Sequence, residues 1–203
     1  MTSAALANTA TVSDEDQLRA DFYALLSLLL TRAPDQDSLY QIAGLQGDAT
    51  VLGQGIGALA RLAASVTPDD AAREYNALFI GLGRGELLPY ASYYLTGFLN
   101  EKPLAVLRDH MAQLGLERDP TVKEPEDHIA SLCEIMAGLI TGAHGVQLST
   151  ADQHAFFNTH LATWAGHFFS DLEAAKGATL YAPVGTIGRL FTEIEIEAFR
   201  LDG

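Results

Sequence analysis

The sequence predicts an all-α protein, a single globular bundle of eight to ten helices. Apolar residues recur at the three- and four-residue spacing of a helix along most of the chain. No segment shows the sustained two-residue alternation of a strand, and no repeat of fixed period is visible. A length of 203 residues with a hydrophobic fraction of 48% is enough for one substantial core.

The first predicted helix begins near Ser13. Residues 1–12 are small and polar, so we expect a flexible N-terminus ahead of one helical domain over 13–203. Ser13 is followed three residues later by Asp16, a pattern typical of a helix N-cap. The apolar period then continues until Pro34, which ends the helix.

Two further helices are expected over 37–45 and 49–66. The second carries three glycines, which either weaken the helix or let a neighbouring helix approach it closely. These glycines are Gly53, Gly55 and Gly57.

The stretch over 67–99 organises the rest of the chain. Thr67 and Pro68 form a strong helix start, because threonine caps well and proline suits the first helical position. One apolar face of this helix is formed by Tyr75, Leu78 and Phe79. A glycine-hinged, tyrosine-rich loop with acidic flanks follows over 81–94. Together they suit a cleft for an extended peptide.

Four more helices are expected after residue 100, over 103–114, 125–143, 150–173 and 183–200. The polar stretch between the first two of them, residues 115–124, is the most plausible hinge. Such a hinge would let one half of the chain pack on a second copy. The sequence is therefore compatible with either a monomer or a domain-swapped dimer.

The composition excludes several partners. Twelve Lys plus Arg against 26 Asp plus Glu give a formal net charge of −14, and phosphate binding needs a basic face, so nucleic acid is not expected. No apolar run is long enough for membrane insertion, and the N-terminus lacks the pattern of a signal peptide. The single cysteine, Cys133, marks no oxidising compartment. We therefore expect a cytoplasmic protein.

Enzyme motifs are missing from the sequence. No histidine has the Glu-x-x-His spacing of a dimetal bundle, and no two histidines have the i, i+4 spacing of a helical zinc site. The nucleophile-elbow and P-loop patterns are missing too. We therefore expect no catalytic residue, no metal site and no cofactor. The glycines of 81–85 are the only stretch that could be offered as a GTP site.

A second notable cluster is the run Glu-Pro-Glu-Asp-His at 124–128. Pro125 predicts a helix start, which puts Asp127 and His128 in the first turn. A plain helix cap would explain the carboxylates without any function. Because charged groups are seldom buried unpaired, we expect Asp127 and His128 to contact a ligand directly. His128 could also make binding sensitive to pH.

Three motifs in this order resemble the signature of the TorD/DmsD family, which are cytoplasmic chaperones for the maturation of molybdenum-containing redox enzymes. The helical pattern agrees with this family over nearly the whole chain. The motifs are Tyr75-x-x-Leu78-Phe79, Pro89-x-x-Ser92 and Glu124-Pro125-x-Asp127-His128.

The resemblance implies an all-helical chaperone without catalytic activity. Such a protein binds the twin-arginine signal peptide, the apoenzyme, or both, of a molybdopterin-dependent oxidoreductase, assists cofactor insertion and delays export until folding is complete. The peptide-binding residues expected from the motifs and the loop between them are Tyr75, Leu78, Phe79, Glu86, Pro89, Tyr90, Ser92, Tyr93, Glu124, Pro125, Asp127 and His128.

The residue types suit this role. The apolar part of a leader needs a groove of leucine and aromatic surface, and its arginines need carboxylates. Leu78 and Phe79 are equally consistent with the core. Candidate carboxylates are Glu86, Glu124, Glu126 and Asp127.

Two other functions stay open. One is an assembly chaperone of the NarJ type for a membrane-bound nitrate reductase, whose client is not exported by the same route. The other is a helical adaptor that binds a nucleotide or serves only as a scaffold.

Overall fold

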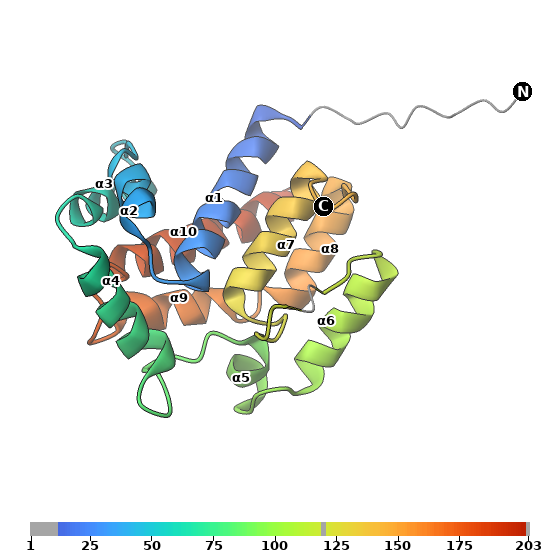
Figure 1. Cartoon of the computed structure of the whole chain (residues 1–203). Helices are drawn as coiled ribbons and strands as arrows, with labels where there is room; N and C mark the ends of the chain where they lie inside the picture. The colour runs from blue at the N-terminus through green and yellow to red at the C-terminus, as the bar shows by residue number, and fades with distance from the viewer. Residues whose placement is uncertain (1–11, 119–120, 202–203) are drawn as a thin grey trace, which may run out of the picture.

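Helices form most of the protein that the structure describes, residues 12–118 and 121–201 of a computed structural model (Figure 1). Ten α-helices and one π-helical turn occur in these ranges, which confirms the predicted all-α class. The flexible N-terminus predicted over 1–12 lies, except for Val12, outside the described residues. None of the described helices is long and apolar enough to cross a membrane.

The first four helices begin at the polar caps that the sequence contains. The Ser13 hydroxyl accepts a hydrogen bond from the Asp16 N–H at 3.1 Å, and the Thr67 hydroxyl accepts one from the Asp70 N–H at 3.2 Å. Each cap satisfies a backbone donor that the first helical turn leaves without a partner. The helices are α1 (Asp14–Thr31), α2 (Gln36–Ala43), α3 (Val51–Ala63) and α4 (Pro68–Tyr75).

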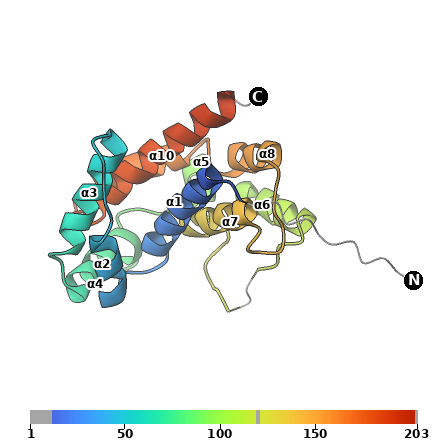
Figure 2. The ribbon, with the colours of Figure 1, turned by 90° about the horizontal axis from the view of Figure 1, so that it is seen from above.

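Two packed pairs of helices build the core. Helix α1 packs along α7 (Ile129–Thr141), and α10 (Ala182–Leu201) packs on both α9 (Ala165–Ala174) and α3 (Figures 1 and 2). A Cβ on Gly55 would lie 3.3 Å from Ile187 Cγ1, so this glycine lets α3 approach α10 closely. Close approach is one of the two roles that the sequence left open for the glycines of α3.

The helix predicted over 150–173 is two helices, α8 (Thr150–His160) and α9. Trp164 causes the break, because its indole N–H donates to the His160 carbonyl at 2.7 Å. In a continuous helix the Trp164 backbone N–H would use that carbonyl; here it donates to Leu161 at 3.1 Å. The prediction of one helix was therefore wrong at this point.

Three boundaries around the central stretch also differ from the prediction. Helix α4 ends in a π-helical turn, η1 (Asn76–Ile80), and a short helix, α5 (Ala91–Thr96), forms where only a loop was expected. Helix α6 (Lys102–Gln113) follows as predicted. Helix α7 starts at Ile129 and not at Pro125. Of the predicted hinge over 115–124, residues 119 and 120 lie outside the described residues.

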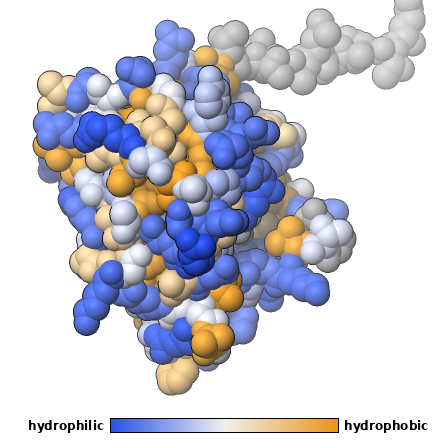
Figure 3. All heavy atoms as spheres, turned by 60° about the vertical axis from the view of Figure 1, so that its left-hand side comes forward, coloured by the Kyte–Doolittle hydropathy of each residue, from blue (hydrophilic) through white to orange (hydrophobic). Residues whose placement is uncertain are grey.

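Apolar side chains are also found on the surface. On the face shown in Figure 3, hydrophobic patches lie among hydrophilic ones. The large exposed apolar side chains come from several elements, from Leu18 in α1 to Phe98 after α5. Scattered exposure of this kind is normal in folded proteins, so exposure alone does not locate a binding site.

A buried ion pair joins the first helix to the last. Both Glu195 carboxylate oxygens accept hydrogen bonds from Arg19, at 2.7 and 2.9 Å, and the Tyr23 hydroxyl donates to one of them at 2.9 Å. Glu195 is 1% exposed. Its charge is tolerated in the core because a guanidinium and a phenol surround it.

Replacing Glu195 with alanine should lower the free energy of unfolding by about 3–5 kcal/mol, since it leaves the Arg19 charge buried without its partner. The exposed pair between Arg200 and Glu197 is the control, and Glu197→Ala should cost less than about 1 kcal/mol. Urea unfolding of both variants measures the difference. Equal losses would show that the buried pair does not hold α1 on α10.

Candidate peptide-binding site

Two of the sequence motifs lie side by side as a short antiparallel pairing. We call this pairing the motif seam, made of residues 89–92 and 127–129. Its two segments meet through an isolated bridge between Tyr90 and His128. Its backbone hydrogen bonds run from the Ala91 N–H to the Asp127 carbonyl (3.0 Å) and from the Ile129 N–H to the Pro89 carbonyl (2.8 Å).

The Asp127 carboxylate fixes the start of α5. Its Oδ2 accepts a hydrogen bond from the Ser92 N–H at 2.8 Å, at the positive end of that helix. The side chain is 1% exposed, and Oδ1 is buried with no hydrogen-bond partner among the described residues. The expectation that Asp127 is accessible to a ligand is therefore wrong, because the carboxylate is used inside the fold.

His128 caps α7. Its ring Nδ1 accepts a hydrogen bond from the Ala130 N–H at 3.1 Å, and its ring lies edge-on to Tyr90 with centroids 5.1 Å apart. Burial lowers the pKa of His128 to about 4, although the charge of Asp127 opposes the shift. The imidazole is thus neutral near pH 7. Like Asp127, it is buried, which corrects the expectation of direct contact.

Glu126 is also bound inside the molecule. Arg108 on α6 donates to Oε2 through two nitrogens, at 3.0 and 2.8 Å, and Arg118 lies 3.4 Å from Oε1. Burial alone would raise the pKa of Glu126, but these guanidinium groups outweigh it and hold the pKa below its ordinary value. The carboxylate therefore anchors the predicted hinge to α6 and is not free for a ligand.

Glu86 connects the glycine loop to the segment before α10. Its two oxygens accept hydrogen bonds from the Lys176 N–H at 2.8 Å and the Gly177 N–H at 3.2 Å. Glu74 does the same one helix earlier, accepting from the three N–H groups of residues 179–181 at 2.7–3.1 Å. Both carboxylates bind backbone about 100 residues away, so no local sequence signal could reveal these contacts.

Glu124 remains as the exposed carboxylate of the motif. The Tyr90 hydroxyl donates to it. Desolvation and the charge of Glu124 raise the pKa of Tyr75 to about 12, so this phenol also lies within electrostatic reach. Phe79 packs on Tyr75 with centroids 5.0 Å apart. We call Tyr75, Phe79, Tyr90 and Glu124 the aromatic–acidic cluster, which is only partly buried and open to a ligand.

Tyr93 already holds a guanidinium of this protein. Arg84, in the glycine loop, donates to the Tyr93 hydroxyl at 2.6 Å and lies 5.2 Å from the centroid of its ring. The loop folds tightly here, because a Cβ on Gly85 would collide with the backbone of Phe79. The loop side of the site thus shows that a tyrosine on this face can bind an arginine.

The remaining predicted residues support the fold. Leu78, Pro89 and Ser92 are buried, and Ser92 Oγ accepts a hydrogen bond from the Glu101 N–H at 3.3 Å. Pro125 is half-buried and precedes a turn, with its carbonyl bonded to the His128 N–H at 3.1 Å. Leu78 therefore belongs to the core, one of the two roles that the sequence allowed.

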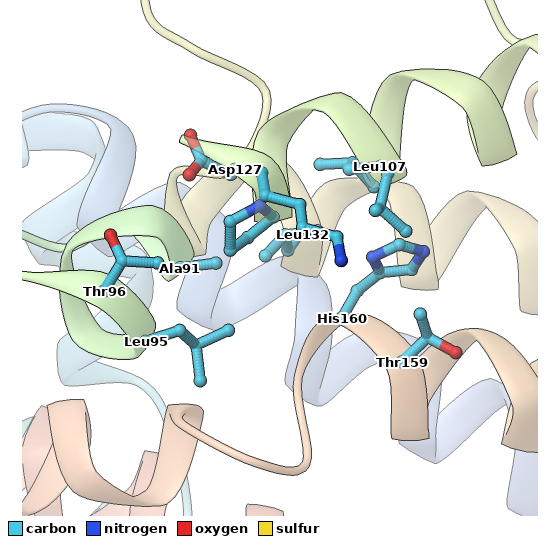
Figure 4. A pocket seen from close by; sticks show the side chains of 11 residues that line it. Ala91, Leu95, Thr96, Leu107, Asp127, Leu132, Thr159 and His160 are labelled. Atoms are coloured by element: carbon cyan, nitrogen blue, oxygen red, sulfur yellow. The ribbon is translucent and has the colours of Figure 1, made fainter. Parts of the chain in front are cut away.

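A pocket that sequence reasoning missed adjoins the seam. It encloses about 250 Å³ between α5, α6, α7 and α8, and Asp127 lies in its wall (Figure 4). Apolar side chains line most of it, and the ring of His160 rises from α8 toward Leu107 and Leu132. Its residues come from four helices, so only the folded chain brings them together. Among the apolar ones are Ala91, Leu95, Pro103, Val106, Leu107 and Leu132.

The described residues hold no cluster of three metal-ligating side chains. Cys133 is buried, and burial raises the pKa of its thiol well above the ordinary range. A thiol in this state is a poor nucleophile. The chemistry available at the site is thus recognition by an exposed carboxylate, aromatic faces and an apolar pocket.

Fold and site together define an all-helical binding protein, and comparison with known proteins places it in a family. Residues 45–170 match the family of the nitrate reductase delta subunit, so the chain belongs to that family. A chaperone protein TorD from Vibrio atlanticus is 29% identical over 90% of this chain and 94% of its own length. These findings confirm the TorD-related family that the motifs predicted.

Further similarities agree. A chaperone protein TorD from Vibrio cholerae is 32% identical over 60% of this chain and 59% of its own length. A solved structure from Archaeoglobus fulgidus, described as a candidate redox enzyme maturation protein, aligns with a TM-score of 0.57 and 23% identity. It covers 93% of this chain and 99% of that one, which supports the TorD-like fold. Because the relatives are named chaperones, the protein is a chaperone and not an enzyme.

The unfolding free energy should fall as the pH is lowered from about 6.5 toward 4. In this window the unfolded His128 is protonated while the folded one, with a pKa of about 4, is not. Each such histidine should contribute a slope of up to about 1.4 kcal/mol per pH unit. His160, whose pKa burial and the neighbouring His110 also lower to about 4, should contribute a similar slope.

Replacing His128 with asparagine separates the two contributions. Asparagine keeps an acceptor for the cap but does not titrate, so His128→Asn should remove about half of the slope. Urea unfolding at about pH 7, 6 and 5 gives the values. Exposed His167→Asn is the control and should keep the full slope. A full slope in His128→Asn would contradict the assignment.

Proposed function

We propose that this protein is a cytoplasmic chaperone for a molybdenum-containing oxidoreductase. It binds the twin-arginine leader of the apoenzyme, assists insertion of the molybdopterin cofactor and delays export until the client is folded. The observation that carries the proposal is the aromatic–acidic cluster. There the exposed Glu124 carboxylate lies beside the phenols of Tyr75 and Tyr90.

This cluster has the chemistry that a guanidinium needs. A carboxylate accepts two parallel hydrogen bonds from arginine, and an aromatic face attracts its charge. The contact of Arg84 with Tyr93 is an internal example of the same pairing nearby. A cationic leader would also be attracted by the formal net charge of −14.

Affinity and selectivity come from different parts of the site. A partly exposed ion pair contributes only about 0–1 kcal/mol, whereas burying a leucine or phenylalanine contributes about 1.5–3 kcal/mol. The apolar surface around Phe79 therefore supplies most of the binding free energy. Glu124 supplies the preference for arginine.

The matched family favours a second candidate function, because its description is that of a nitrate reductase subunit. In that case the client is a nitrate reductase whose N-terminal segment lacks the arginine pair. Titration with two synthetic peptides, one with the arginine pair and one with glutamines in its place, separates the candidates. Equal affinity for both would favour the nitrate reductase client.

No nucleotide is part of this proposal. The glycines of 81–85 leave a helical turn and do not join a strand to a helix, as a phosphate loop does. Their neighbours Arg84 and Glu86 are bound to Tyr93 and to backbone N–H groups. Heat released on titrating GTP with magnesium would contradict this view.

Two substitutions test the division of roles. Phe79→Ala should weaken binding of a twin-arginine peptide by about tenfold or more, through lost apolar burial. Glu124→Gln should weaken it by about fivefold at most, and should abolish the preference for arginine over glutamine. Isothermal titration calorimetry measures both.

Glu134→Gln, an exposed carboxylate on α7, is the matched control and should bind as the wild type does. Circular dichroism melts check that Phe79→Ala remains folded. The proposal fails if the wild type binds no leader. It also fails if Glu134→Gln loses as much arginine preference as Glu124→Gln.

A further inference from the structure

The pocket beside the motif seam is a second candidate binding site. Its volume of about 250 Å³ is enough for one large aliphatic or aromatic side chain. Leu107 and Leu132 lie buried in its wall. The ring of His160 is neutral near pH 7, because its pKa is lowered to about 4. The interior therefore suits an uncharged, apolar group.

The mouth of the pocket is apolar too. Leu95 on α5 is 44% exposed, and Val106 on α6 is 40% exposed. Phe98 and Leu99, in the turn that joins these helices, are 69% and 42% exposed. The apolar surface thus continues from the pocket onto the turn beside it. A ligand that covers both is a segment of chain and not a small molecule.

One polar atom in this wall has an unmet requirement. Asp127 lines the pocket, and its Oδ1 is buried without a hydrogen-bond partner among the described residues. A buried acceptor without a donor costs free energy, which a donor from a ligand would recover. A peptide offers such donors in its backbone N–H groups, whereas a lipid or alkane does not.

The pocket also adjoins the aromatic–acidic cluster. Ala91 lines the pocket and directly follows Tyr90, whose hydroxyl donates to Glu124. From the Cα spacing and the length of a tyrosine side chain, the two places lie on the order of 10 Å apart. An extended peptide covers that distance in about three or four residues.

We propose that this pocket binds the apolar stretch of the client leader that follows its arginines. One leucine-sized side chain enters between Leu95 and Val106, and peptide N–H groups approach Asp127. The assignment rests on the proposed function and extends it, because it names a second recognition element. That element is an apolar anchor about three or four residues after the arginine pair.

Two peptides and three variants of the full chain test the assignment. The peptides share the arginine pair and differ in having leucine or serine about four residues after it. Fluorescence anisotropy gives their affinities. The wild type should prefer the leucine peptide by at least about fivefold. Val106→Trp, which fills the mouth, should reduce the preference to less than about twofold.

The controls separate the pocket from the rest of the site. Leu95→Ser removes one wall without adding bulk and should also reduce the preference for leucine. Val51→Trp places the same new side chain on exposed α3 and should leave it unchanged. Both pocket variants should keep the preference for arginine over glutamine, because the Glu124 contact is intact.

Each outcome decides one question. A leucine preference that persists in Val106→Trp and Leu95→Ser overturns the pocket assignment. So does a wild type that binds both peptides equally but still prefers arginine, and in that case the proposed function stands. A wild type that binds neither peptide removes the proposed function itself.

Discussion

The site depends on one buried carboxylate. Asp127, at 1% exposure, accepts the backbone N–H of Ser92, 35 residues earlier in the chain. Together with the backbone pairing of the motif seam, this bond sets where α5 begins and how it faces α7. Helix α5 forms one wall of the pocket, and Tyr90, at its N-cap, reaches Glu124. Without this contact neither part of the recognition surface would have a defined shape.

The acidic character of the chain is therefore a poor guide to its binding surface. Glu74, Glu86 and Glu126 lie in or near the motifs, yet each is bound by backbone N–H groups or arginines of the protein itself. Segments before helices have donors without partners, and distant carboxylates satisfy them. Of the four carboxylates proposed from the sequence for arginine binding, Glu124 is the one left exposed.

Local signals in the sequence predicted much of the fold and less of the site. Caps such as Ser13 and Thr67 act within one helical turn, so they could be recognised from spacing alone. The break at Trp164 and the short helix α5 depend on a side-chain bond to a carbonyl and on Asp127, which periodicity does not show. The burial of Asp127 and the pocket arise only when distant helices meet, so neither could be predicted from sequence spacing.

Hydrogen exchange with and without a twin-arginine leader tests the central claim most directly: the motif seam is a framework for recognition on both of its sides. Bound leader should slow exchange in residues 86–107 and 121–132. The α2–α3 pair, on the far side of α1, should not change. Slower exchange confined to α2, α3 or the end of α10, with residues 86–107 unaffected, would contradict the account.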